Sequence, residues 1–214
     1  MPDGRKLVRS YYAQLGAAGL RNRTRPHWDS AITDEVIPYL GARQRVLDVG
    51  CGYGRIAHLL AARGYRVTGL DISEPLLHNA RETAVEKATP LPVALADMVR
   101  MPFRTASFDA TICLWSAYFE LVDVTDQVRA LGEMSRVLVH DGLAVVEGPA
   151  PPSSDDEVPA DRVRYGTVEG IPMQGYCHDL DTLRQRCAQA GITECEVRVR
   201  VWGGRDRTVL TFQP

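Results

Sequence analysis

The residues from position 48 to position 54 have the types and spacing of a ligand-binding turn. Gly50, Gly52 and Gly54 alternate with larger residues, and Asp48 precedes the first of these glycines by two positions. Glycine has no Cβ atom, so the backbone can turn sharply there and approach a ligand closely. An apolar stretch precedes this turn and a helical pattern follows it, and open parallel sheets bind ligands at such strand ends. The turn therefore predicts a binding site between a strand and a helix.

Two more acidic residues follow at predicted strand ends. Asp71 comes directly after the apolar run 66–70, and its carboxylate can accept hydrogen bonds from both hydroxyls of a ribose. Asp97 ends a third apolar stretch and can accept from an adenine amino group, while Met98 can pack on the ring. Together the three turns have the order and spacing of one nucleoside-binding cleft.

The glycine spacing favours S-adenosylmethionine (SAM) over a dinucleotide as the ligand. A dinucleotide fold more often has a third glycine later in the helix, where this chain has Arg55. The methionine part of SAM carries no phosphate, so the helix dipole is not needed to bind a diphosphate. Asp48 would repel a diphosphate, but it can orient the ammonium group of SAM, directly or through water.

The same segments resemble the class I SAM-dependent methyltransferase family of small-molecule type. The glycine turn resembles the family's motif I, and residues 69–73 (GLDIS) resemble motif II. The family has a further segment in which an acidic residue is followed by Leu-Pro-Phe and then by Ser-Phe-Asp. Residues 97–103 and 107–110 resemble it, with Met101 and Arg104 as mild departures. Residues 133–138 and 141–142 resemble the helix and turn before its fifth strand. These matches cover residues 45 to 147.

The resemblance implies a fold, an activity and a set of cofactor contacts. The fold is a doubly wound, Rossmann-like α/β structure, with a mostly parallel seven-stranded sheet whose last strand is antiparallel and with helices on both faces. The activity is methyl transfer from SAM, by in-line displacement, to an N, O, S or C nucleophile of a small-molecule acceptor, leaving S-adenosylhomocysteine and requiring no metal. The implied cofactor contacts are Asp48, Gly50, Cys51, Gly52, Asp71, Ile72, Asp97, Met98 and Leu114.

The sequence says less about the methyl acceptor than about the cofactor. Methyl transfer from an activated sulfonium can depend mainly on the alignment of acceptor, methyl group and sulfur, and this needs no particular catalytic side chain. Aromatic residues suggest an enclosed, partly apolar pocket. The candidate acceptor contacts are Tyr11, Tyr12, Trp28, Trp115, Tyr118 and Glu147. His178 and His27 are the candidates for a general base, should the acceptor have to lose a proton. Structural alternatives stay open: Tyr11 and Trp28 can serve only in the packing of the N-terminal cap, His178 can start a helix, and Glu147 can pair with an arginine.

The elements that must position these residues alternate between helix and strand patterns, which is typical of an α/β fold. We expect one domain over residues 1–214, with a helical cap at 1–40 that a Gly-rich break interrupts at 16–19. A SAM-binding core follows at 45–147, and a closing helix and strand pair at 179–214. Residues 149–176 are rich in Pro, Gly and Asp, and a connection of this length is usually functional or disordered. We expect it to be a mobile lid loop.

Composition restricts the partners. The 214 residues are 45% hydrophobic and carry a formal net charge of −2, which does not indicate binding to nucleic acid or to an anionic membrane. No apolar stretch approaches the roughly 20 residues of a membrane span, and the N-terminal residues lack a signal-peptide pattern. We therefore expect a cytoplasmic protein. The five cysteines form no CxxC pair, so they indicate neither a zinc site nor a disulfide framework. The sequence does not predict the oligomeric state.

Three other functions compete with this hypothesis. A nucleic-acid or protein methyltransferase could use the same fold, although the chain reads Leu-Trp-Ser-Ala at 114–117, where an Asn-Pro-Pro-Tyr or Asp-Pro-Pro-Tyr type of signature would stand. A SAM-binding protein could catalyse non-methylating chemistry or only regulate, because methyl donation needs no side-chain signature of its own. A nicotinamide dehydrogenase is disfavoured by the glycine spacing and by Asp48.

Overall fold

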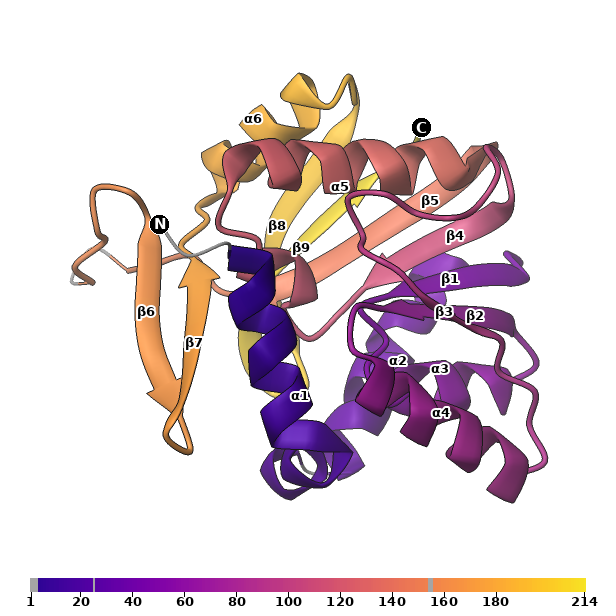
Figure 1. Ribbon diagram of the computed structural model, residues 1–214. Coiled ribbons are helices and arrows are strands. Elements are labelled where there is room, and N and C mark those ends of the chain that lie inside the picture. The colour runs from indigo at the N-terminus through magenta and orange to yellow at the C-terminus, as the bar shows by residue number, and fades with distance from the viewer. Residues whose placement is uncertain (1–3, 25, 154–155) are drawn as a thin grey trace.

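A computed structural model describes residues 4–24, 26–153 and 156–214 of the chain. Figure 1 shows one large sheet covered by helices and, beside helix α1, a separate β-hairpin. The helices are α1 (Gly4–Arg23), α2 (Pro26–Leu40), α3 (Arg55–Ala61), α4 (Glu74–Glu86), α5 (Val124–Val137) and α6 (Leu180–Gln189), with a 3-10 turn η1 (Ala117–Glu120). The strands of the sheet are β1 (Arg45–Val49), β2 (Arg66–Asp71), β3 (Val93–Leu95), β4 (Phe108–Cys113), β5 (Leu138–Pro149), β8 (Cys195–Trp202) and β9 (Arg205–Phe212).

The strand order of the large sheet is β3-β2-β1-β4-β5-β9-β8. Strands β1 to β5 pair in parallel, and β9 is antiparallel to both of its neighbours. The predicted seven-stranded, mostly parallel sheet with an antiparallel last strand is therefore confirmed. The chain moves outward from β1 to β3 and then returns to place β4 on the other side of β1. Ligands of open α/β sheets bind at such a switch point, beyond the carboxyl ends of the strands.

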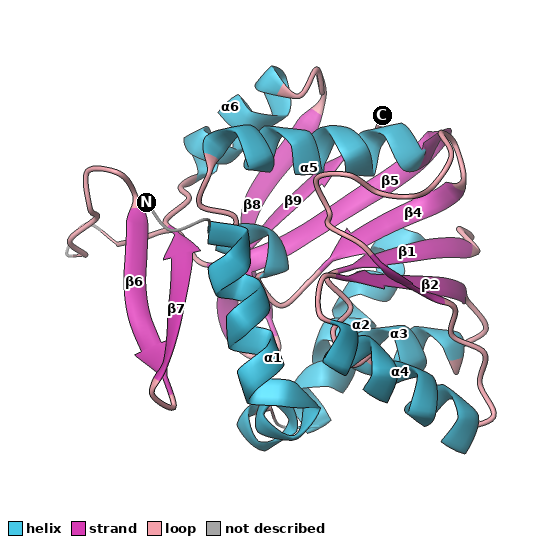
Figure 2. Cartoon of the chain, in the orientation of Figure 1, coloured by secondary structure: helices cyan, strands magenta, loops and turns pink. Residues whose placement is uncertain are grey.

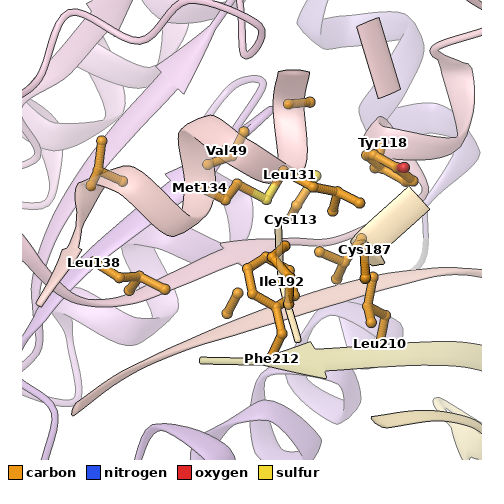
Figure 3. Close-up of a cluster of buried hydrophobic side chains, with 14 of the residues drawn as sticks. Val49, Cys113, Tyr118, Leu131, Met134, Leu138, Cys187, Ile192, Leu210 and Phe212 are labelled. Atoms are coloured by element: carbon orange, nitrogen blue, oxygen red, sulfur yellow. The ribbon is translucent and has the colours of Figure 1, made fainter. Parts of the chain in front are cut away.

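Helices cover both faces of the sheet, as Figure 2 shows. Its central strands are buried on both sides, which is why the sequences of β1 and β4 are apolar almost without alternation. On one face, α5 and α6 contribute Leu131, Met134 and Cys187 to a core that also contains Leu210 and Phe212 (Figure 3). On the other face, apolar side chains of α2, α3 and α4 pack together against the sheet.

The segment 149–176 is not the continuous loop that the sequence predicts. Strands β6 (Val163–Val168) and β7 (Ile171–Tyr176) form an antiparallel hairpin. Glu169 and Gly170 join them, and both have positive φ angles (53° and 78°), as a type I′ turn requires. Most of β6 is exposed, and Val163 is its one buried residue, so the strand lacks the alternating apolar pattern of a half-buried strand. The hairpin therefore had no clear signal in the sequence.

Helix α1 also differs from its prediction. The expected break at 16–19 is only a kink at Gly16 (φ 62°, ψ 179°), after which the helix continues to Arg23. Ala17 and Leu20 pack there against Tyr53 and Leu76, and this contact offsets the low helix propensity of the glycines. Within the described ranges, no helix is both long and apolar enough to cross a membrane.

Substitution of Leu131 by alanine tests the core beneath α5. Leu131 is fully buried, so the variant should lose about 3 kcal/mol of unfolding free energy through lost burial and a residual cavity. Urea denaturation measures this loss. Val85→Ala is the matched control, because Val85 is 81% exposed on α4 and its truncation should change stability by less than about 0.5 kcal/mol. Equal losses in the two variants would contradict the packing described here.

Candidate functional site

A cavity of about 740 Å³ lies at the carboxyl ends of β1, β2 and β4. Its floor is the glycine turn between β1 and α3. Residues of α1 and of β6 (Val163 and Tyr165 among them) line it as well, as do residues between β4 and α5. The volume suits a ligand of nucleoside size or larger. The cavity therefore occupies the switch point, between the sheet and the two segments that cover it.

The glycine turn is held in a conformation that only glycine adopts readily. Gly50, Gly52 and Gly54 have φ angles of 76°, 55° and 78°, in the left-handed region. A Cβ atom on Gly50 would lie 2.6 Å from the Cβ atom of Ala117 in η1. The turn is thus packed between the sheet and η1. Side chains at these positions would strain the backbone and, at Gly50, collide with η1.

Asp71 connects the glycine turn to the end of β2. Its Oδ2 atom accepts a hydrogen bond from the backbone N–H of Gly52 at 2.7 Å, and its Oδ1 atom accepts from that of Ser73 at 2.8 Å. Burial raises the pKa of Asp71, while these backbone hydrogen bonds oppose the shift. The carboxylate therefore has a fixed orientation at the cavity wall before any ligand binds.

Asp48, Asp71 and Glu120 form a group of buried carboxyls that line the cavity, which we call the acidic group. Burial raises the pKa of Asp48 to about 7, helped by the charge of Asp71 and opposed by Arg55. Burial also raises the pKa of Glu120 to about 8; a hydrogen bond from Tyr12 opposes this shift and the charge of Asp71 adds to it. A cation in the cavity would lower these pKa values, because it favours the ionised carboxyls. The acidic group is thus complementary to a positively charged ligand.

Asp97 lies at another part of the cavity wall. Its Oδ1 atom accepts from the backbone N–H of Val99 at 3.1 Å, and its Oδ2 atom accepts from the guanidinium of Arg5 at 3.3 Å. The Nε atom of Arg5 also lies 3.2 Å from the carboxylate of Asp126. These ion pairs hold the first turn of α1 against the rim of the cavity.

His178 is buried away from the cavity. Its ring stacks 5.5 Å from the ring of Tyr118, measured between centroids, and also contacts Phe119 and Tyr176. Burial, together with the charges of Arg186 and Arg162, lowers the pKa of His178 to about 3. The side chain is therefore neutral and part of the core, directly before the capping box that Asp179 forms at the start of α6.

A hydrogen bond links Trp115, just after β4, to the side chain of Glu147 in β5. The backbone N–H of Trp115 donates to Oε2 of Glu147 at 2.7 Å, and Arg207 donates to Oε1. Trp115 and Ser116 both have positive φ angles (56° and 71°), which are uncommon for residues with side chains. Glu147 is fully buried. Its carboxylate therefore stabilises the strained turn that carries Trp115 instead of facing the cavity.

Comparison with known proteins assigns the core. A family described as "Methyltransferase domain" matches residues 46–142. The demethylmenaquinone methyltransferase of Thermus thermophilus is 36% identical over 114 residues, 52% of this chain and 50% of that protein. The nocamycin O-methyltransferase of Saccharothrix syringae is 32% identical over 127 residues, 58% of this chain and 44% of that protein. The chain spans about half the length of the curated relatives it matches. The similarity in sequence to methyltransferases therefore lies in the core of the chain, residues 46–142.

Solved methyltransferase structures extend the likeness in fold to nearly the whole chain. The sugar N-methyltransferase KedS8 from Streptoalloteichus sp. matches with a TM-score of 0.68 at 21% identity, covering 94% of each chain. The 1,6-didemethyltoxoflavin-N1-methyltransferase of Burkholderia thailandensis matches with a TM-score of 0.71 at 17% identity, covering 97% of this chain and 87% of that one. At these identities the likeness concerns the fold alone.

The structure brings the methyltransferase motifs together. All nine residues predicted to contact the cofactor line the cavity, and their roles remain predictions. Of the candidate acceptor contacts, Tyr12 and Trp115 line it, whereas Tyr11, Trp28, Tyr118 and Glu147 are not among the described residues that do. Neither candidate base reaches it: His178 is in the core, and His27 is exposed on α2, with its ring 5.8 Å from that of Trp28.

Several charged residues that line the cavity were not predicted as site residues, and three of them make notable contacts. Glu120 accepts a hydrogen bond from the Tyr12 hydroxyl at 2.5 Å, and Arg5 pairs with Asp97. The guanidinium of Arg55 lies 4.0 Å from the ring centroid of Trp115. The sequence held one usable signal: Glu120 is a single acidic residue between apolar neighbours, from Ala117 to Val122. Nothing in the sequence pairs Arg5 with Asp97, 92 positions away.

The raised pKa values predict how stability depends on pH. A folded-state pKa above the unfolded value means that the folded protein holds a proton that the unfolded chain releases. Stability from Asp48 and Glu120 is therefore complete below about pH 4 and is lost as pH rises through about 7 to 8. Each group should account for up to about 4 kcal/mol of this loss.

Urea denaturation of the protein without ligand at pH 5, 6.5 and 8.5 measures this dependence. The double variant Asp48→Asn, Glu120→Gln should lose less stability between pH 5 and pH 8.5 than the natural sequence. Asp141→Asn, at an exposed position of β5, is the control and should behave like the natural sequence. Parallel pH curves for all three proteins would contradict the assigned burial of the two carboxyls.

Proposed function

We propose that the chain transfers a methyl group from SAM to a small-molecule acceptor by in-line displacement, leaving S-adenosylhomocysteine. The observation that carries this proposal is that the nine motif residues line one cavity at the switch point of the sheet. The cavity also fits SAM chemically. Glycines allow close approach of a ligand to the turn, and the acidic group complements a ligand that carries a sulfonium and an ammonium group.

Each cofactor contact has a proposed role. Asp71 accepts from the ribose hydroxyls; its oxygens already accept from two backbone N–H groups, but each has a second lone pair. Asp97 accepts from the adenine amino group, for which it has to share or release Arg5. Asp48 orients the ammonium group, while the backbone of Gly50, Cys51 and Gly52 borders the methionine part. Ile72, Met98 and Leu114 supply apolar walls.

The chemistry that SAM supplies is an electrophilic methyl group on a sulfonium leaving group. The positive charge on sulfur decreases as the methyl group leaves, so carboxylates near sulfur stabilise the bound substrate more than the transition state. The protein's contribution to rate is therefore alignment of donor and acceptor, an effect worth up to about 7–11 kcal/mol. The glycine turn and Asp71, which is held by two backbone N–H groups, would keep the donor in one orientation for that alignment.

The nature of the cavity wall supports a small organic acceptor. Aromatic and apolar side chains such as Tyr12, Trp115, Val8 and Leu20 line it. The acidic group disfavours a nucleic acid, since its phosphates would approach several carboxylates. Curated relatives named for demethylmenaquinone and nocamycin methylation also take small organic acceptors, which is consistent with this class. We propose that residues 1–40 and the hairpin-containing segment 149–176 enclose the acceptor above the core (45–147), which the elements of 179–214 complete.

Isothermal titration calorimetry with SAM and with S-adenosylhomocysteine tests the cofactor assignment. Both should bind to the protein, and Asp71→Asn should weaken each by about tenfold or more, because a hydrogen bond to a charged group is lost. Asp141→Asn is the matched control and should bind like the natural sequence. A melting curve of each variant verifies that it is folded.

Failure of both ligands to bind to the natural sequence would overturn the proposed function. Mass spectrometry then shows whether the label of methyl-labelled SAM is transferred to small organic acceptors. Binding of SAM without such transfer would instead favour a SAM-binding protein with other chemistry.

Hydrogen exchange tests the covering role of segment 149–176. Asp161, Val163 and Tyr165 from this segment line the cavity, so a bound ligand should reduce their fluctuations. We expect amides in this segment to exchange more slowly with S-adenosylhomocysteine and an acceptor than without them. The helix α6 provides an internal control, since none of its residues lines the cavity. Equal protection of the segment in both states would contradict its role as a lid.

A further inference from the structure

The acidic group contains one carboxyl that the proposed cofactor contacts do not use. Asp71 is oriented by two backbone N–H groups at the glycine turn, and Asp48 lies beneath the same turn. Glu120, at the end of η1, has the Tyr12 hydroxyl as its one hydrogen-bonding partner among the described residues. That bond involves Oε1 and leaves Oε2 with no such partner. Glu120 is 7% exposed and faces the cavity.

We propose that Glu120, with Tyr12 donating to it, binds a small amine acceptor as its ammonium form and takes the proton that the nitrogen must lose before methylation. This inference rests on the proposed methyl transfer and specifies its acceptor class. Carboxylates at the rim of the cavity already have partners: Asp97 accepts from Arg5 and Val99, and Asp126 pairs with Arg5. Asp123 and Asp161 accept from the backbone N–H groups of Asp126 and Val163. The histidines of the described ranges do not line the cavity.

The proposed reaction balances in atoms and charge. An ammonium nitrogen has no free electron pair, so its N–H bond breaks first and the proton moves to the carboxylate of Glu120. The freed pair on nitrogen forms a bond to the donated methyl carbon, while the carbon–sulfur bond breaks and leaves its electrons on sulfur. The product is a methylated ammonium ion, and the proton on Glu120 is released to solvent.

The surroundings of Glu120 favour an amine over a hydroxyl acceptor. The titratable groups that face it are Tyr11 and Tyr12 from α1, Asp71 at the end of β2 and Cys113 in β4. None of them is cationic. A hydroxyl becomes negative as it loses its proton, which the charge of Asp71 opposes, whereas an ammonium becomes neutral. The pKa of Glu120 near 8 also lies within a few units of that of an alkylammonium, which suits proton exchange between the two.

Matched amines and alcohols test this inference by binding, independently of turnover. The probes are cyclohexylamine with cyclohexanol and benzylamine with benzyl alcohol, titrated by calorimetry into the protein saturated with S-adenosylhomocysteine at pH 7.5. Each amine should bind at least about tenfold more tightly than its alcohol, because a charged hydrogen bond to a buried carboxylate is formed. Equal affinities, or no binding of either amine, would overturn the inference.

Variants assign the effect to the pair. Glu120→Gln keeps the shape of the side chain and should remove the preference for amines, while Tyr12→Phe should reduce it. Both should still bind S-adenosylhomocysteine. The exposed Glu86→Gln on α4 is the control and should keep the full preference. An unchanged preference for amines in Glu120→Gln would overturn the inference. Failure of the natural sequence to bind S-adenosylhomocysteine would instead overturn the proposed function.

Carbon-13 NMR of labelled glutamate carboxyls gives a second readout. One resonance that Glu120→Gln removes should titrate near pH 8, and its pKa should fall when benzylamine binds in the presence of S-adenosylhomocysteine. A resonance whose titration does not respond to benzylamine would contradict contact between Glu120 and the acceptor nitrogen.

Discussion

Asp71 accepts hydrogen bonds from the backbone N–H groups of Gly52 and Ser73, and so joins the turn after β1 to the turn after β2. The site depends on this interaction. Three residues with positive φ angles, Gly50, Gly52 and Gly54, would otherwise leave the backbone between β1 and α3 free to adopt many conformations. With the turn fixed, η1 can pack on Gly50 through Ala117, and the cavity has a rigid floor at the switch point of the sheet.

The acidic group has an energetic cost that the fold carries until a ligand binds. Asp48, Asp71 and Glu120 are buried near one another, so ionising all three is unfavourable, and their raised pKa values express this. A cationic ligand relieves the cost. Under the proposed function, binding and protonation are linked: a sulfonium donor and an ammonium acceptor would both favour the ionised form of the site. The same buried carboxyls that lower stability at high pH would favour a positively charged ligand.

Local patterns were sufficient to predict much of the fold. β1 and β4 are apolar along most of their length because both faces are buried, and the glycine turn has a spacing that follows from backbone geometry. All nine cofactor candidates lie at the carboxyl ends of strands or just after them, and a parallel sheet brings these ends to one edge. The hairpin β6–β7 was missed because β6 is mostly exposed and lacks an apolar period, and because its Glu-Gly turn is not a strong hairpin signal.

The acceptor side could not be predicted because it depends on contacts between distant segments. Tyr12 and Glu120 are 108 positions apart, and only the path of α1 over the cavity brings them together. In the sequence, His178 was a candidate for a general base. In the structure, its imidazole packs in the core against three aromatic rings, and burial together with the charges of two arginines keeps it neutral. Such distinctions arise from tertiary packing, which residue type and spacing do not specify.

A crystal structure of the protein with S-adenosylhomocysteine tests the central claim most directly, namely that the cavity at the switch point holds the methyl donor. We expect the ribose hydroxyls within hydrogen-bonding distance of Asp71, the adenine between Asp97 and the apolar wall formed by Met98 and Leu114, and the sulfur directed toward the part of the cavity that Glu120 and Tyr12 line. Electron density for the ligand at another place, or at this cavity with its nucleoside away from Asp71 and Asp97, would contradict the account.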